Sequence, residues 1–150
     1  MMSHAEATAL FRATRPERCV LGERAILLAQ AVALHESGYG SGWGRSCPEM
    51  VGSWNMGAIQ GSPGAICGDS HADGSRYTAR YRIYPSAEAG AAGLWHELWR
   101  RPGVRRVLLD NSLDVRGMAK AMRASGYFEA TESSYVKALQ NAVERIKAGP

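Results

Sequence analysis

The pattern of apolar and polar positions predicts helices on either side of an irregular middle segment. Residues 25–34 are apolar at every position except Gln30, and a helix that is apolar all round belongs in the centre of a core. We therefore predict a buried helix over residues 17–37, ended by a left-handed residue at Gly38. Residues 38–74 hold ten of the chain's 17 glycines and show no helical period, which predicts an irregular, partly β insertion.

A half-buried strand is predicted at residues 76–84, where aromatic or apolar residues alternate with polar ones. The residues of its inward face are Tyr77, Ala79, Tyr81 and Ile83. The dipeptide Asp73-Gly74 just before this strand is typical of a hairpin turn. Residues 64–67 are therefore the predicted partner strand.

Helices are predicted for the rest of the chain. Ser3 and Glu6 have the spacing of a capping box, which begins a helix over residues 3–13. Ser86 caps a second helix that runs to residue 100. Further helices are predicted over residues 104–109, 114–125 and 131–147. The chain of 150 residues is expected to form one domain, mainly α (α+β), with its β insertion at about residues 38–84.

The net charge of +4 favours a polyanionic partner: nucleic acid, anionic lipid or an acidic cell-wall polymer. The arginines are scattered rather than massed in one tract, which argues against nucleic acid. No apolar run reaches the roughly 18 residues that span a bilayer, so no membrane insertion is expected. The first residues also lack the layout of a secretory signal.

Three cysteines, Cys19, Cys47 and Cys67, leave at least one unpaired. Cys47 and Cys67 flank the glycine-rich segment and could bridge it, but geometry decides this and the more ordinary outcome is three buried or inert thiols. Together with His35 and His71 they match no standard zinc spacing. No metal and no cofactor are therefore expected.

Glu36 is an unusual place for a carboxylate, because it ends the buried helix on the same face as Leu28 and Val32. Desolvation and the negative end of the helix dipole both raise the pKa of a carboxyl group there. A carboxylic acid that is still protonated near neutral pH can donate a proton in catalysis. The competing interpretation is an exposed side chain at a frayed helix end.

Four segments, in this order, resemble one enzyme family. They are "LLAQAVALHESGYG", "SWNMGAIQG", "YRIYPSAEAGAAGLWHEL" and "MAKAMRASGYFEATESSYVKAL". They are similar to the lysozyme superfamily, and most similar to bacterial β-N-acetylglucosaminidases of the flagellar-muramidase and autolysin type. The match covers about residues 25–147 and depends on the order of the motifs, since each is weak alone.

The resemblance implies a lysozyme-like helical domain with a small β-hairpin lobe over a cleft, and cleavage of β-1,4 bonds in the glycan strand of peptidoglycan. Glu36 takes the position of the general acid. Tyr127 takes that of a tyrosine lining the cleft near the reacting sugar, with core packing as its competing role.

The resemblance also implies where the substrate lies. Asn55, Gly57 and Gln60 would border the sugar-binding groove, and their competing role is a structural turn. Trp43 and Trp54 are candidates for stacking on sugar rings, with plain packing as the alternative.

The sequence does not identify the second catalytic carboxylate, because the chain departs from the family pattern. Met56 directly precedes Gly57 where a Phe is usual, and the hairpin carries an extra "CGDSHADGS". Asp69 and Asp73 are the candidates, with Glu49 behind them. Each is also an ordinary solvated loop acid or turn-former.

The expected activity is that of an endo-β-N-acetylglucosaminidase, with a lytic transglycosylase or muramidase as the alternative. A non-catalytic wall-binding or virion module is the second alternative. We expect a monomer that acts on the bacterial wall, in the periplasm or outside the cell. Without a secretory signal, it would be a phage lysin or virion component, a secreted effector or a domain cut from a longer protein. The hairpin is expected to be the most mobile region.

Overall fold

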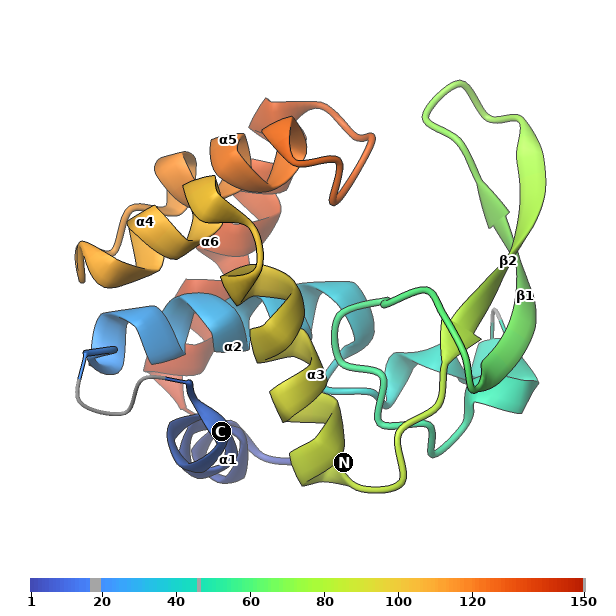
Figure 1. The fold of residues 1–150 in the computed structure, drawn as a ribbon, viewed down its shortest axis with the longest axis horizontal. Coiled ribbons are helices and arrows are strands. Elements are labelled where there is room, and N and C mark those ends of the chain that lie inside the picture. Colours follow the sequence, from blue (N-terminus) through green and yellow to red (C-terminus); the bar gives the residue numbers. More distant parts are fainter. Residues whose placement is uncertain (17–19, 46, 150) are drawn as a thin grey trace.

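The computed structural model describes residues 1–16, 20–45 and 47–149, and helices form most of it (Figure 1). In chain order the helices are α1 (His4–Thr14), α2 (Glu23–Ser37), α3 (Ala87–Trp99), α4 (Pro102–Leu109), α5 (Val115–Ala124) and α6 (Glu132–Ala148). Between α2 and α3 lie two 3-10 turns, Gly42–Arg45 and Pro48–Met50, and a hairpin of β1 (Gly64–Ser70) and β2 (Arg76–Arg82). The predicted mainly helical α+β fold is confirmed. No helix among the described residues is long and apolar enough to cross a membrane.

Helix α2 lies at the centre, packed against α1, α3, α4 and α6. Its single polar position in the apolar run, Gln30, is 1% exposed. The Gln30 amide donates to the His4 carbonyl at 2.9 Å and to the Tyr39 hydroxyl at 3.1 Å, and accepts from the Thr8 hydroxyl at 2.9 Å. Because each of these polar atoms is paired, burying Gln30 carries no penalty of an unmade hydrogen bond.

The helix ends follow the predicted capping residues. Ser3 and Glu6 form the capping box of α1, and Ser86 caps α3 by accepting from the Ala89 amide. Gly38 ends α2 with a left-handed backbone of φ 54°. These contacts are local, which is why sequence spacing predicts them.

The predicted start of α2 at residue 17 is wrong for residues 20–22, which are not helical, while residues 17–19 lie outside the described part of the chain. Gly22 is the N-cap, with an extended backbone. A Cβ atom at Gly22 would lie 2.6 Å from the Asn111 side chain. Helix α2 begins directly after Gly22, at Glu23, because glycine is a poor helix former.

The hairpin pairs β1 and β2 in antiparallel register, from Gly64 opposite Arg82 to Ser70 opposite Arg76. Strand β1 runs three residues past the predicted 64–67, and Gly74 takes the expected turn conformation with φ 85°. The inward placement of Ile83 is wrong. Strand β2 ends before it, its amide bonds to the Pro63 carbonyl, and its side chain is 40% exposed.

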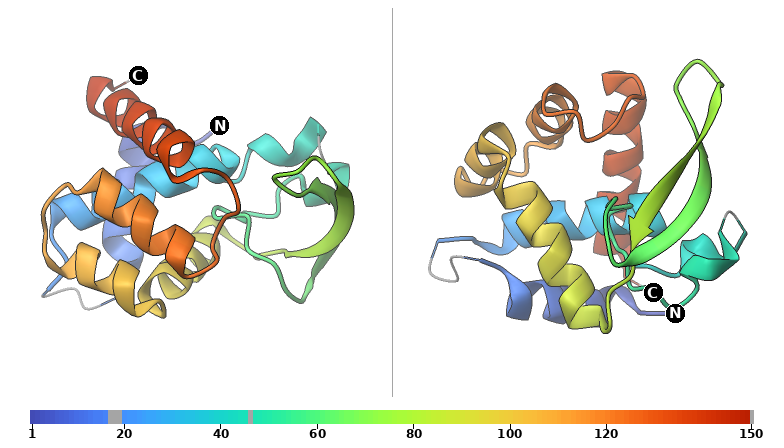
Figure 2. Two further views of the ribbon diagram at one scale, coloured as in Figure 1. Left: turned by 90° about the horizontal axis from the view of Figure 1, so that it is seen from above. Right: turned by 45° about the vertical axis from the view of Figure 1, so that its right-hand side comes forward.

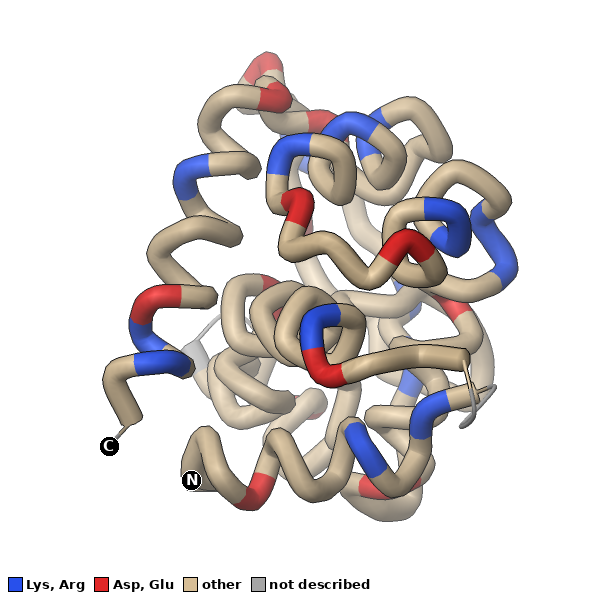
Figure 3. The backbone as a smooth tube through the Cα atoms, turned by 90° about the vertical axis from the view of Figure 1, so that its left-hand side faces the viewer, with Lys and Arg blue, Asp and Glu red and all other residues tan. Residues whose placement is uncertain are grey.

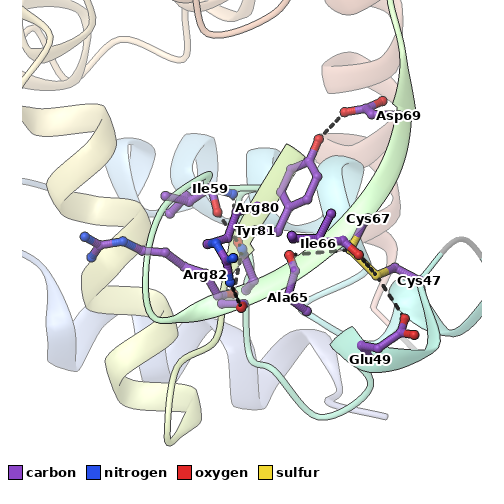
Figure 4. Close-up of a disulfide and its surroundings, with 12 residues drawn as sticks. Cys47, Glu49, Ile59, Ala65, Ile66, Cys67, Asp69, Arg80, Tyr81 and Arg82 are labelled. Carbon is purple, nitrogen blue, oxygen red and sulfur yellow. Dashed lines mark hydrogen bonds between the residues drawn. A yellow bond between two sulfur atoms is a disulfide. The ribbon is translucent and has the colours of Figure 1, made fainter. Parts of the chain in front are cut away.

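The hairpin has a small core of its own, separate from the helical core. Cys47 and Cys67 form a disulfide there, with Cα atoms 5.5 Å apart, next to buried Met50 and Tyr81 (Figure 4). The bond joins the turn before Pro48–Met50 to β1. It settles the choice that the sequence left open between a bridge and free thiols.

The hairpin stands beside the helical body and is joined to it at its base (Figure 2). Its tip reaches the connection between α5 and α6, where the His71 ring nitrogen Nδ1 lies 3.1 Å from both carboxylate oxygens of Glu129. The space between hairpin and helices is thus bounded at the base and at the tip.

Candidate active site

The C-terminal end of α2, which carries Glu36, is hydrogen-bonded to the loop that follows residue 52. Ser37 donates from its hydroxyl to the Met56 carbonyl at 2.9 Å and accepts from the Gly40 amide at 2.8 Å. Gly38 then turns the chain away from the helix. Each residue of the Glu-Ser-Gly ending therefore has its own role. Glu36 provides a carboxyl group, Ser37 bonds the helix end to the following loop, and Gly38 provides the left-handed turn.

The carboxyl group of Glu36 is half-buried, and a tyrosine hydroxyl contacts it closely. The Tyr135 hydroxyl, 99 residues away in sequence, donates to Glu36 Oε1 at 2.5 Å. The Tyr135 ring stacks on Phe128, with centroids 3.7 Å apart, and meets the edge of His35 at 5.0 Å. Burial raises the pKa of Glu36 to about 7, even though the Tyr135 hydrogen bond acts to lower it. The carboxyl group is thus a proton donor near neutral pH.

Tyr135 is a site residue that the sequence did not single out. It stands in the last resembling segment, where only the recurrence of a tyrosine marked it. Helical spacing places Tyr135 on the same stripe of α6 as Leu139, and both are buried. The helical spacing is the same for a tyrosine that packs in the core and for one that contacts a catalytic residue. The contact between Tyr135 and Glu36 is therefore visible only in the folded structure.

We expect Tyr135→Phe to raise the pKa of Glu36 above its wild-type value of about 7. The hydroxyl stabilises the ionised carboxylate, and the phenyl ring keeps the stacking on Phe128. Carbon-13 NMR titration of the glutamate carboxyl groups measures the shift, with Glu36→Gln assigning the signal. Tyr81→Phe removes a hydroxyl that bonds Asp69 instead, and is the matched control. An unchanged or lowered Glu36 pKa in Tyr135→Phe contradicts the assignment.

Two adjoining pockets meet at Glu36. The first, here called the arginine pocket, has a volume of about 280 Å³ and is lined by Glu36, Gly57, Ala58, Ile59, Gln60, Glu97, Arg100, Arg101, Gly126 and Tyr127. The second, here called the hairpin pocket, has a volume of about 420 Å³. Its lining includes Glu36, Ala58, Gln60, Asp69, His71, Tyr77, Tyr81, Gly126, Tyr127, Glu129 and Tyr135. Because the two share Glu36, Ala58, Gln60, Gly126 and Tyr127, they form one cleft with the acid in the middle.

Tyr127 and Gly57 both line the arginine pocket and are bonded to each other. The Tyr127 hydroxyl donates to the Gly57 carbonyl at 2.8 Å. A Cβ atom at Gly57 would lie 2.6 Å from that hydroxyl oxygen and 2.6 Å from Leu94 Cδ1. Only glycine therefore permits this close approach, which fixes the tyrosine at the cleft wall.

Asn55 and Gln60 have different positions. Asn55 is fully buried, and its amide bonds the Ile59 amide at 2.8 Å, the Ile59 carbonyl at 2.8 Å and the Arg82 carbonyl at 3.0 Å. It ties the loop to the end of β2, which is the structural-turn alternative. Gln60 is exposed and lines both pockets.

Neither Trp43 nor Trp54 is among the residues that line the two pockets at Glu36. Trp43 donates from its indole to the Asn55 carbonyl at 3.1 Å and packs on Tyr81 within the hairpin core. Trp54 packs against the helical core and borders another pocket, beside Met1 and Met2. Both therefore have the packing role that was the alternative to stacking on sugar.

Of the candidate second acids, Asp69 is the one that lines the cleft. Tyr81 donates to Asp69 Oδ2, and Tyr77 donates to the same oxygen at 2.9 Å. Partial burial acts to raise the pKa of Asp69, but the hydrogen bonds from Tyr81, the Ser70 amide and Tyr77 outweigh it and lower the pKa. Asp69 is therefore ionised wherever Glu36 is protonated near neutral pH.

Asp73 and Glu49 have ordinary surroundings. Asp73 is exposed and accepts from the Ser75 amide at 2.8 Å and the Ser75 hydroxyl at 2.6 Å, which closes the hairpin turn. Glu49 is exposed on the turn Pro48–Met50. Neither is among the residues that line the two pockets.

Glu129 is an acid of the cleft that the sequence did not suggest. It lies in the α5–α6 connection, binds His71 and accepts weakly from the Ala72 amide at 3.4 Å. His71 also stacks on Tyr77, with ring centroids 4.4 Å apart. These contacts join the tip of the hairpin to the helical body at one edge of the hairpin pocket.

The hairpin is expected to move when a glycan binds. Its small core and its few tip contacts predict that amides of residues 64–80 exchange faster than those of residues 26–34, and slow when a chitin oligomer is added. Hydrogen exchange with mass spectrometry measures both. Glu129→Gln should speed exchange at the tip without affecting α2. If the hairpin is already as protected as α2 and does not respond to the oligomer, it is not a moving part.

The cleft carries no evident metal site. Cys47 and Cys67 are joined to each other and so cannot act as thiolate ligands. Across residues 1–16, 20–45 and 47–149, no group of three or more His, Cys, Asp and Glu side chains could hold a metal ion.

Comparison with known proteins gives a fold but no close relative. No protein-family model matches the sequence, and no curated protein matches it. Among solved structures, the catalytic domain of the autolysin Auto from Listeria monocytogenes has a TM-score of 0.63 at 15% identity, over 94% of this chain and 80% of that one.

Two further structures give the same result. The glycoside hydrolase domain of FlgJ from Salmonella typhimurium has a TM-score of 0.58 at 21% identity, over 96% of this chain and 86% of that one. A peptidoglycan hydrolase from Sphingomonas sp. A1 has a TM-score of 0.54 at 22% identity, over 95% of this chain and 92% of that one. The chain thus has the fold of these glycoside hydrolase domains, as the resemblance in its sequence implied.

Proposed function

We propose that this protein hydrolyses β-1,4 glycosidic bonds in the glycan strand of peptidoglycan, with Glu36 as the general acid. The observation that carries the proposal is the placement of Glu36, half-buried between two adjoining pockets with its pKa raised to about 7. The structural neighbours are an autolysin, a glycoside hydrolase domain and a peptidoglycan hydrolase, and their names support the substrate class.

In this proposal Glu36 protonates the departing glycosidic oxygen while an oxocarbenium-like state develops on the sugar ring. Tyr135 orients the carboxyl group through its 2.5 Å hydrogen bond. Tyr127, fixed on the Gly57 carbonyl, forms the wall beside the reacting bond. Asp69 supplies an ionised carboxylate on the hairpin side of the cleft.

Three second steps are compatible with one general acid. Asp69 activates a water molecule, which inverts the anomeric carbon. Alternatively, the 2-acetamido group of the substrate attacks, which retains it. In a lytic transglycosylase, the muramic C6 hydroxyl attacks and no water enters. The ionised state of Asp69 in the same cleft favours the first route.

The products of digested cell wall distinguish the possible bonds. We expect reducing-end N-acetylglucosamine, the product of an endo-β-N-acetylglucosaminidase, by mass spectrometry of the released fragments. Reducing-end N-acetylmuramic acid identifies a muramidase, and anhydro-muramic acid identifies a transglycosylase. Absence of any Glu36-dependent cleavage overturns the proposal and leaves a wall-binding or virion module.

The charge distribution supports a wall polymer over nucleic acid. Along the backbone drawn in Figure 3, Lys and Arg positions are interspersed with Asp and Glu positions, whereas nucleic-acid binding typically needs a continuous basic patch or stripe. We propose that the protein acts as a monomer on the bacterial wall, in the periplasm or outside the cell. A turbidity assay on cell walls, compared with a DNA-shift assay, tests the choice of partner.

A further inference from the structure

The two halves of the cleft differ in charge. The arginine pocket is lined by Arg100 and Arg101 with one further carboxylate, Glu97, besides Glu36. The hairpin pocket is lined by Asp69 and Glu129, and its lining among the described residues includes no Lys or Arg. With Glu36 in its neutral acid form, the arginine pocket has a net positive charge. The hairpin pocket carries the two carboxylates of Asp69 and Glu129.

The two guanidinium groups converge on one carboxylate. Arg100 Nε donates to Glu97 Oε2 at 2.8 Å, and Arg101 Nη2 donates to the same oxygen at 3.3 Å. A single carboxylate therefore neutralises only one of the two cations. The pair keeps a charge of about +1 at the pocket wall, and a free carboxylate is a suitable partner for it.

Arg101 is held rigidly, while Arg100 faces solvent. Arg101 is 13% exposed, donates to the Ser125 carbonyl at 3.1 Å and lies over the Tyr127 ring at 5.1 Å. Its Nε atom is buried without a hydrogen-bond partner in the described parts of the chain. Arg100 is 51% exposed, and Glu97 is the partner of both its Nε and its Nη2. Donor capacity for an incoming anion therefore remains on both residues.

The surrounding chain adds a positive field. Residues 100–123 carry seven of the 18 Lys and Arg residues and two of the 14 acids. Such a field raises the local concentration of anionic ligands. Arg106 belongs to this segment and is exposed, but it is not among the residues that line the pocket. Arg106 is therefore a cation of equal charge that lies outside the arginine pocket.

The charges also give the cleft a direction. The sugar that becomes oxocarbenium-like gains positive charge, and the carboxylates of the hairpin pocket stabilise it there. The leaving sugar then occupies the arginine pocket, on the other side of Glu36. In peptidoglycan the sugar with an acidic branch is N-acetylmuramic acid. Its 3-O-lactyl group ends in a carboxylate or in a peptide stem that bears carboxylates.

We propose that Arg100 and Arg101 form a carboxylate-binding subsite for the 3-O-lactyl branch of the muramic acid on the leaving-group side of the cut bond. The proposal rests on the function proposed above and deepens it. It makes this arginine pair the determinant of which glycosidic bond is cleaved. A muramic acid in the arginine pocket leaves N-acetylglucosamine as the new reducing end.

The test measures binding and cleavage with three glycans: a chitin oligomer, glycan strands whose stems an amidase has removed, and strands with stems intact. Dissociation constants are measured by calorimetry in the Glu36→Gln background, and kcat and KM in the wild-type background. The variant is Arg100→Gln, which removes an exposed cation and leaves the more buried Arg101 in place. The control is Arg106→Gln, which has the same change in net charge.

We expect Arg100→Gln to weaken binding of the muramic acid strands about tenfold, the value of a lost charged hydrogen bond. Binding of the chitin oligomer should change less than about twofold, since it has no carboxylate, and Arg106→Gln should have no selective effect. If Arg100→Gln weakens binding of the stem-free strands, the arginines bind the lactyl carboxylate. If it weakens binding only of strands with intact stems, they bind the carboxylates of the peptide. Equal losses on chitin, no loss on either strand, or the same loss in Arg106→Gln overturn the subsite. If the wild type cleaves none of the glycans, the proposed function itself has failed.

Discussion

Glu36→Gln should fold normally and lose nearly all glycan-cleaving activity. Glutamine has almost the same shape and can still accept the Tyr135 hydrogen bond, but it cannot donate a proton at the required strength. General acid catalysis is typically worth about 10²–10⁴-fold, so the variant should retain less than about one hundredth of the wild-type rate. Release of reducing ends from purified cell wall measures it. Retention of more than about a tenth excludes Glu36 as the acid.

The same variant has a stability signature that separates loss of chemistry from loss of fold. Burial raises the pKa of Glu36 from 4.5 to about 7, so the folded protein binds this proton more tightly than the unfolded chain. Wild-type stability therefore falls as the pH rises from about 4.5 through about 7. Glu36→Gln escapes that loss, and should be more stable than wild type by on the order of 2 kcal/mol above pH 7.

Urea denaturation at pH 4 and at pH 8 measures this difference. We expect the two proteins to be similar at pH 4, where Glu36 is protonated in both states. Glu49→Gln replaces an exposed acid and should leave both activity and stability unchanged. A Glu36→Gln protein that is less stable than wild type at pH 8 would show that the carboxylate is compensated by its surroundings. The raised pKa, and the acid role with it, would then be wrong.

The features that sequence reasoning predicted correctly are those decided within one helical turn or one hairpin. Ser3 with Glu6, Ser86 before Ala89 and Gly38 after α2 satisfy backbone groups a few residues away. The strand alternation around Tyr81 is equally local. The boundary of α2 was predicted less well. The helix begins at Glu23, after Gly22, which has an extended backbone and serves as the N-cap.

The position of Glu36 could be predicted, but not its surroundings. Its place at the end of an apolar helix predicted the direction of its pKa shift, since a carboxyl group beside apolar residues is desolvated. Its partner Tyr135 and the opposing wall at Tyr127 come from elements about a hundred residues away. No spacing rule connects such positions in a single sequence.

Aromatic and amide residues were the least predictable of the candidates. Trp43 and Asn55 are as suitable for binding sugar as for packing, and the fold uses both for packing: Trp43 bonds the Asn55 carbonyl, and Asn55 ties Ile59 to β2. The arginines were judged by their scatter along the chain. That criterion missed Arg100 and Arg101, which line one pocket together because α3 ends and α4 begins there.

The second prediction with a large effect concerns the hairpin acids. Asp69→Asn should lower the rate of glycan cleavage by at least about tenfold. General base catalysis is typically worth about 10²–10⁴-fold. Asp69 lines the cleft and is held ionised by its hydrogen bonds, whereas asparagine keeps an acceptor for Tyr81 and Tyr77 but has no basic oxygen. The loss should therefore appear in kcat, with the fold of the hairpin preserved.

Asp73→Asn is the matched control, because it makes the same chemical change four residues away in the same hairpin. Asp73 is exposed and bonds only its own turn at Ser75, so this variant should keep a rate near that of wild type. The anomer released first, followed by NMR, gives a second measurement, since a water-activating Asp69 inverts the anomeric carbon. If Asp69→Asn and Asp73→Asn are both close to wild type, Asp69 is not the base. Glu36 then acts with the substrate's own 2-acetamido group or with the muramic C6 hydroxyl. Retention of configuration or an anhydro product, respectively, identifies which of the two attacks.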